Sequence, residues 1–191
     1  MINQKKTIAG LSVILFAVVS GILALLISDD GTEQEKRDRN YTPGTYIDEQ
    51  VKESSVFLYF GDRKRPYLIS EERVVSHPEN PVLFGKKIIA ELIKGSNSGL
   101  MRSLPAETAV RAFYITKNKT AYVDFSREIS DNHPGGGPME NLTIYSIVNS
   151  LVLNIPEIET VKILVDGQEA ETLAGHINIR YPLQADMLIV R

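Results

Sequence analysis

The chain opens with a long apolar stretch and continues with short apolar groups at regular spacing. Residues 7–27 carry no charged side chain and are almost entirely apolar. About 20 such residues suffice for a helix to cross the hydrocarbon core of a bilayer, and a helix pairs its backbone polar groups internally. The segment is therefore predicted to be a single transmembrane anchor that precedes the rest of the protein.

The charges that flank this apolar segment predict its orientation. Lys5 and Lys6 precede it, whereas Asp29 and Asp30 follow it. Positively charged residues are enriched on the cytoplasmic side of a membrane helix. Residues 1–6 are therefore expected in the cytoplasm. Everything after the helix is expected outside the cytoplasmic (inner) membrane, as a periplasmic or other extracytoplasmic domain.

A cleaved signal peptide is the alternative interpretation of the same segment. Its apolar core would be about 7 to 15 residues long and would end in small residues. Ser20 and Gly21 offer small residues of this kind, but the apolar run continues through 22–27. That continuation favours an uncleaved signal-anchor over a cleaved peptide.

Residues 28–55 form a charged stretch that is poor in large aliphatic side chains. Such a composition buries too little apolar surface to order itself, so a flexible spacer is predicted. The excess negative charge of the chain lies mainly here, and the remainder is nearly neutral. No nucleic-acid partner is predicted, because the sequence contains no basic stripe or run.

From residue 56 the pattern indicates alternating strands and helices. Asn80 and Pro81 have the chemistry of a helix start, and Gly95 that of a helix end. Strands are predicted at 56–60, 67–75, 109–116, 120–126, 160–165 and 171–176, and helices at 82–94 and 142–155. The predicted fold class is an α/β (α+β) two-layer sandwich, in which two amphipathic helices cover one mixed sheet. It spans 56–183, and 184–191 form a tail.

Each predicted helix shows one apolar and one polar face. In the first helix the polar face comprises Lys86, Lys87, Glu91 and Lys94. In the second it comprises Asn141, Thr143, Ser146, Asn149 and Ser150. A helix with a single apolar face uses that face for its own core. The domain is therefore expected to be a monomer in dilute solution, and any self-association is expected to require the membrane or a partner.

Several blocks in the second half resemble the GerMN domain of sporulation and spore germination proteins. They are Asp131-Asn132-His133-Pro134-Gly135-Gly136, the helix beginning at Leu142, Val161-Lys162-Ile163-Leu164-Val165-Asp166-Gly167, and Glu171-Thr172-Leu173-Ala174-Gly175-His176. The resemblance covers about 56–183. It implies a non-enzymatic domain with a fold similar to that of ring-building domains. Many relatives are lipoproteins, whereas this chain has no cysteine to carry a lipid.

Chemistry-bearing residues are scattered and match no catalytic motif. Asp124 and Asp166 could form a two-carboxylate hydrolase site, but a backbone-binding role for Asp124 at a strand end and a turn role for Asp166 are favoured. The run 135–137 lacks the lysine and hydroxyl residue of a phosphate-binding loop. The histidines His133 and His176 are expected to shape a loop and a turn. No cofactor and no metal are predicted.

Two further sets of residues are candidates for binding. Tyr59, Phe60 and Tyr67 could form an exposed aromatic patch for glycans, with core packing as the alternative. The segment after the predicted Asp-Gly turn could be an exposed sheet edge that docks a partner chain. The candidate interaction residues are Asp166, Gly167, Glu171, Thr172, Leu173, Gly175 and His176.

These features together predict a membrane-anchored, extracytoplasmic module that binds or assembles envelope proteins. The resemblance to sporulation and germination proteins and the lack of a catalytic constellation support this hypothesis. The alternative is an accessory protein or hydrolase that acts on peptidoglycan or another glycan. The sequence leaves the identity of the partner protein open.

Overall fold

The computed structural model describes residues 52–191. The predicted cytoplasmic end, the predicted anchor at 7–27 and nearly all of the predicted spacer lie outside the described residues. Among residues 52–191, every helix is too short or too polar to cross a bilayer.

The described domain contains strands and helices in the predicted order, with one additional helix. They are β1 (Glu53–Gly61), β2 (Leu68–Ser76), α3 (Pro81–Lys94), β3 (Val110–Ile115), β4 (Thr120–Phe125), α4 (Glu128–Asp131), α5 (Gly137–Val152), β5 (Thr160–Val165) and β6 (Gln168–Glu169). The short α4 had no counterpart in the prediction. The last strand is β6, so the predicted strand at 171–176 is wrong, and that segment is a loop.

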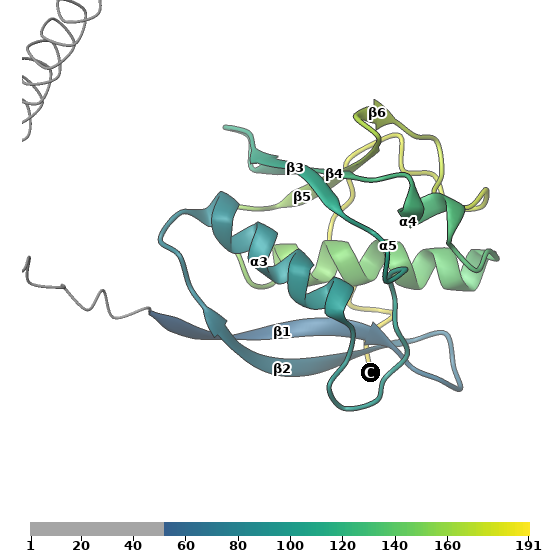
Figure 1. The fold of residues 1–191 in the computed structure, drawn as a ribbon, viewed down its shortest axis with the longest axis horizontal. Helices are drawn as coiled ribbons and strands as arrows, with labels where there is room; N and C mark the ends of the chain where they lie inside the picture. The colour runs from purple at the N-terminus through teal and green to yellow at the C-terminus, as the bar shows by residue number, and fades with distance from the viewer. Residues whose placement is uncertain (1–51) are drawn as a thin grey trace, which may run out of the picture. The chain divides into compact units, whose positions relative to one another are not determined.

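The strands form two sheets in place of the single predicted sheet. β1 and β2 make an antiparallel hairpin, and the other sheet has the order β3-β4-β5-β6. It is mixed, because β4 and β5 run parallel while its other pairs are antiparallel. Helices α3 and α5 lie between the two sheets (Figure 1). The mixed α/β class is confirmed, but the two-layer, one-sheet architecture is wrong.

Helix α3 begins and ends where its capping residues predict. The side chain of Asn80 accepts hydrogen bonds from the backbone N–H groups of Val82 and Leu83, and Gly95 ends the helix with a positive φ. Its buried face packs so closely on β3 that a Cβ on Gly85 would lie 2.3 Å from Cζ of Phe113. The glycine therefore allows the helix to approach the strand.

Helix α5 is buried on nearly all sides, which contradicts its predicted polar face. The side chains of Thr143, Ser146, Asn149 and Ser150 are at most 1% exposed. Ser146 and Ser150 hydrogen-bond the backbone of Tyr59 in β1. These polar side chains take the place that a further strand would occupy beside β1, because they bind backbone groups that β2 does not reach.

The C-terminal segment is attached to both sheets. Leu183 and Val161 of β5 exchange backbone hydrogen bonds, each 2.8 Å long. Farther along, the backbone of Leu68 in β2 bonds to Ile189 at 2.7 Å and to Arg191 at 2.9 Å. Residues 189–191, predicted to be part of a tail, therefore pair with the edge of β2.

Candidate functional site

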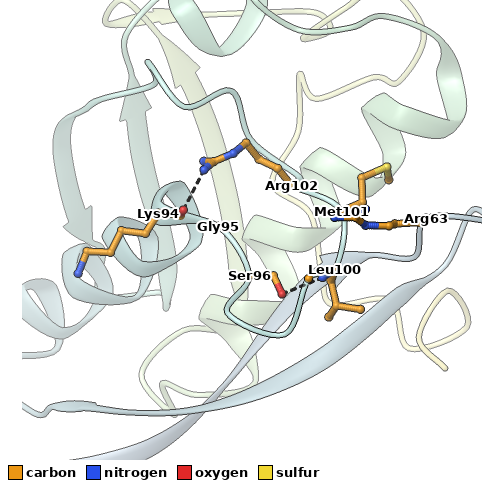
Figure 2. A pocket seen from close by; sticks show the side chains of 8 residues that line it. Arg63, Lys94, Gly95, Ser96, Leu100, Met101 and Arg102 are labelled. Atoms are coloured by element: carbon orange, nitrogen blue, oxygen red, sulfur yellow. Dashed lines mark hydrogen bonds between the residues drawn. The ribbon is translucent and has the colours of Figure 1, made fainter.

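An open pocket of about 470 Å³ lies where α3 ends. Its lining is Arg63, Lys94, Gly95, Ser96, Gly99, Leu100, Met101 and Arg102. Figure 2 shows Arg102 reaching across to the end of the helix, where its guanidinium donates to the carbonyl of Lys94 at 2.9 Å. Ser96 accepts the N–H of Leu100 at 3.0 Å. The walls are therefore held by internal hydrogen bonds and carry positive charge.

A buried ionic cluster fixes the loop that forms this pocket. Arg73 of β2 pairs with Glu71 and Glu91, and it also donates to the carbonyl of Gly95 at 3.0 Å. Glu71 in turn accepts hydrogen bonds from the hydroxyl groups of Ser96 and Ser98. Two ionised glutamates and one arginine thus connect a strand, a helix end and a loop.

Burial raises the pKa of Glu71, but hydrogen bonds from Ser96, Ser98, Asn97 and Arg73 outweigh it. They hold the pKa well below the ordinary value of 4.5. Glu91 behaves in the same way: burial opposes ionisation, and its bonds with basic neighbours lower its pKa. Both carboxylates are therefore ionised at neutral pH, bound to cations and hydroxyl groups.

Sequence reasoning misplaced Glu91 and missed the cluster as a whole. Glu91 was assigned to the polar face of the helix, whereas it is 7% exposed. One signal was present, since Glu91 follows the core residue Ile88 by three positions and so lies beside the apolar stripe. No pattern pointed to Arg73, because its two partners come from separate elements.

The predicted Asp-Gly turn forms, and it carries a four-residue charge cluster. Asp166 adopts a positive φ of 51° between β5 and β6. Arg111 binds both Asp124 and Asp166, and Arg127 binds Asp166 from the other side at 3.1 Å. Hydrogen bonds from Arg127 and Arg111 lower the pKa of Asp166. The two carboxylates therefore do come together, but arginines bind both of them.

Asp124 also has the backbone role that its strand-end position predicted. It accepts the N–H of Gly167 at 2.7 Å. A general acid must hold a proton near the working pH. Asp166, whose pKa is lowered and whose carboxylate is bound by two guanidinium groups, is ionised instead. The geometry of this cluster joins the turn to the strands β3 and β4.

The remaining predicted interaction residues lie in a loop that wraps around Glu140. Glu140 of α5 is 0% exposed. Its carboxylate accepts the backbone N–H groups of Leu173 at 2.8 Å, Ala174 at 2.9 Å and His176 at 2.8 Å. Thr172 accepts the N–H of Gly175 at 3.0 Å. The motif thus forms a closed loop on α5, which corrects the expected exposed sheet edge.

Burial of Glu140 raises its pKa, but the backbone N–H groups of the loop outweigh this and lower it. Glu171 lies at the surface, where it pairs with Arg180. No sequence signal showed that Glu140 is buried, because an acidic residue in the first turn of a helix is ordinarily exposed. The loop and the helix turn are far apart in sequence, and only the fold brings them together.

The histidines have structural roles, which the sequence predicted for His133 and His176. His133 accepts or donates at both ring nitrogens, contacting Thr143 and the N–H of Gly135, each at 3.0 Å. His77 stacks on Phe84 with ring centroids 4.0 Å apart. Among residues 52–191, histidine and acidic side chains do not gather into a group that could hold a metal.

The aromatic residues weighed for glycan binding separate into different environments. Tyr59 and Phe60 are 6% and 0% exposed, so they belong to the core. The guanidinium of Arg191 lies over the ring of Tyr67, with its central carbon 4.6 Å from the ring centroid. The structure instead brings Tyr114 and Tyr122 together on adjacent strands, with stacked rings 4.8 Å apart. This pair was missed because cross-strand neighbours depend on the register of the hairpin.

Comparisons with solved structures show several similar folds. A putative lipoprotein from Clostridium perfringens is 27% identical, with a TM-score of 0.50 over 70% of this chain and 87% of that chain. The first GerMN domain of the sporulation protein GerM from Bacillus subtilis is 22% identical, with a TM-score of 0.51 over 70% of this chain and 96% of that one. A comparison with curated proteins gives no match.

The tandem GerMN domains of the same Bacillus subtilis protein give a TM-score of 0.52 at 22% identity. The match covers 71% of this chain but 46% of the tandem structure, so the chain spans about half of it. The model of the Germane family, described as sporulation and spore germination, matches residues 57–171. The predicted resemblance is thereby confirmed, and the chain belongs to the Germane family of sporulation and spore germination proteins.

Proposed function

We propose that this protein is a non-catalytic, membrane-anchored module of the bacterial envelope that binds or assembles other envelope proteins. Membership of the Germane family supports a role in sporulation or germination. The similar fold of a putative lipoprotein supports a position outside the cytoplasm at a membrane. The predicted helix at 7–27 would supply the anchor that a lipid supplies elsewhere.

The observation that carries the protein-binding role is a firmly held apolar segment near the C-terminus. Leu188 is 82% exposed, Tyr181 70% and Met187 52%. The backbone between them is fixed, because Asp186 exchanges two hydrogen bonds with the side chain of Asn149, 2.8 and 3.0 Å long. A partner that covers this segment would lose little conformational entropy from it.

Such a contact would contribute measurably to the affinity of a complex. Full burial of a leucine or methionine side chain contributes about 1.5–3 kcal/mol. Because Met187 is 52% and Leu188 82% exposed, covering both would contribute about 2–4 kcal/mol. That range corresponds to roughly 30-fold to 1,000-fold in affinity.

The interaction can be tested in the native membrane. We expect cross-linking and purification of the full chain to recover a discrete partner, and a Leu188→Lys variant to lose it. Leu83 of α3 is 53% exposed on a different element, so Leu83→Lys is the matched control. Recovery of the same partners from both variants would show that the C-terminal segment is not the contact.

A glycan-directed role is the second candidate, favoured by the stacked pair Tyr114 and Tyr122. Tyr114 is 45% exposed, and flat aromatic faces suit the apolar faces of sugar rings. Incubation of the purified chain with peptidoglycan separates the candidates. Released fragments would indicate a hydrolase, and sedimentation with the wall that Tyr114→Ala abolishes would indicate a glycan-binding accessory. Neither result is expected for a protein-binding module.

A further inference from the structure

The hairpin of β1 and β2 ends in a basic turn, residues 62–66, whose backbone is internally held. The carboxylate of Asp62 accepts the N–H groups of Lys64 at 2.6 Å and Arg65 at 2.8 Å. Asp62 also donates its own N–H to the carbonyl of Tyr67 at 2.8 Å. The single acidic residue of the turn is thereby engaged by the backbone, and the turn keeps one shape.

Positive charge is concentrated around this turn. On one side lies the pocket of about 470 Å³ with Arg63, Lys94 and Arg102. Beside the turn lies a hollow of about 420 Å³, and the basic residues in its lining are Lys64, Arg65 and Arg191. These linings contain six basic side chains and one carboxylate, that of Asp62, although the domain is nearly neutral overall.

Three of these cations are available to a ligand. Within the described part of the chain, the side chains of Arg63, Lys64 and Arg65 are exposed and take part in no ion pair. Arg102 is used at the end of α3, and Arg191 lies over Tyr67. The latter two contribute charge from fixed positions, while the turn contributes free guanidinium and ammonium groups.

A third, smaller hollow of about 190 Å³ joins the turn to an apolar floor. Its lining combines the turn with Met101, Pro138, Met139 and Leu142. A ligand that follows the turn would meet cations on either side and apolar surface between them. This alternation suits a chain in which anionic groups are separated by short carbon segments.

We propose that the basic turn 62–66 binds a flexible polymer of phosphodiester-linked polyols, outside the membrane. Guanidinium groups bind phosphate oxygens in a bidentate manner, and several such contacts along one polymer act together. A flexible polymer can pass around a projecting turn from one hollow to the other. A folded acidic protein would instead need a matching cleft.

The turn lies far from the residues at which the chain enters the described domain. The turn lies at the opposite end of β1 from the first described residue (Figure 1). A nine-residue strand is about 30 Å long at roughly 3.3 Å per residue. The turn is therefore about one strand length away from the end at which the chain enters the described domain.

The test measures the fluorescence anisotropy of a labelled glycerol phosphate hexamer as the purified full chain is added. The salt concentration is about 0.1 M, at which the interaction between charges more than about 10 Å apart is strongly screened. We expect saturable binding that weakens as salt is raised. Replacement of Arg63, Lys64 and Arg65 together by alanine should weaken binding by at least about 10-fold, which corresponds to roughly 1.4 kcal/mol of binding free energy. These residues are exposed, and a thermal melt will show that the variant folds.

A control variant removes the same charge elsewhere. Lys52, Lys86 and Lys117 are exposed, and their joint replacement by alanine should change affinity by less than about 2-fold, because these sites lie outside the hollows. Equal weakening in both variants would overturn the proposal, since it would show attraction by net charge alone. Equal affinity for a polyglutamate of the same charge would overturn it in favour of an acidic protein.

Two more arms address other sources of phosphate. Inorganic phosphate should compete only at much higher concentration than the hexamer. Binding to phosphatidylglycerol vesicles without binding to the hexamer would place the turn at a membrane and overturn the proposal. Failure of the hexamer to bind would do so as well. None of these outcomes depends on Leu188. The protein-binding proposal therefore stands or fails by a separate experiment.

Discussion

The loop around Glu140 allows the sharpest prediction of stability. In Glu140→Gln, one carboxylate oxygen becomes an NH₂ group. Leu173 and Ala174 both donate to Oε1, so they keep an oxygen acceptor, whereas His176 donates to Oε2 and would face a second donor. The variant thus weakens two charge-assisted hydrogen bonds and leaves the partly buried N–H of His176 without its acceptor.

The magnitude follows from these three bonds. Bonds to a charged acceptor contribute about 1.5–3 kcal/mol each and neutral bonds about 0.5–1.5, so two weakened bonds cost about 2 kcal/mol. An unpaired buried N–H costs about 1–3 kcal/mol more, and the easier burial of a neutral amide offsets part of the total. We expect a net loss of about 3 kcal/mol, a large share of the stability of a domain this size.

Urea unfolding followed by circular dichroism measures this loss, and hydrogen exchange locates it. Exchange in residues 171–177 should accelerate before exchange in the strands. Glu157→Gln is the control, because Glu157 is exposed and should change stability by less than about 0.5 kcal/mol. A loss below about 1 kcal/mol in Glu140→Gln, with unchanged exchange in the loop, would refute the role assigned to this carboxylate.

The same carboxylate gives a pH dependence with a defined sign. The pKa of Glu140 is lowered from 4.5 in the folded state, so its stabilisation is complete above that value. It is lost as the pH falls through the lower, folded-state pKa. The wild-type protein should therefore lose its advantage over Glu140→Gln in acid, and an unchanged difference would contradict the lowered pKa.

Three further predictions concern the helices and the buried cluster. Gly85→Ala should destabilise the domain by about 1–3 kcal/mol, because its methyl group meets the Phe113 ring, and wild-type unfolding would contradict this packing. Arg73→Met should cost about 3 kcal/mol in urea unfolding, since it leaves the buried Glu71 without a cation and removes one of the cations that pair with Glu91, and a neutral effect would show that Glu71 is protonated in the variant. Residues 52–191 should sediment as a monomer at micromolar concentration, because α5 is enclosed by both sheets, and a stable oligomer would reveal another interface.

The local elements were predictable because their signals are local. The cap at Asn80, the stop at Gly95 and the turn at 166–167 each depend on a few adjacent residues. The apolar spacing of α5 identified a helix, but its hydroxyl and amide side chains suggested an exposed face. They are buried because they bind partners that are distant in sequence. Ser146 and Ser150 bind the backbone of β1 more than 80 residues away, whereas Thr143 binds the carbonyl of Ser103 and Asn149 the backbone of Asp186.

The division into two sheets could not be predicted for the same reason. Alternation shows which face of a strand is buried, but it does not name the neighbouring strand. The predicted interaction motif at 171–176 has a specific pattern whose role depends on Glu140, some 30 residues earlier. The basic residues of the turn 62–66 are adjacent in sequence, whereas its hollows require the loop at 95–102 and the C-terminal segment.

Site-specific photo-cross-linking in living cells tests the protein-binding role most directly. A photoreactive residue would replace Leu188 in the full chain, with a second chain carrying it at Leu83 for comparison. The account predicts one discrete cross-linked envelope protein from position 188 and none from position 83. Equal, diffuse cross-linking from both positions, or none from position 188, would contradict the claim that this segment is a protein-binding surface.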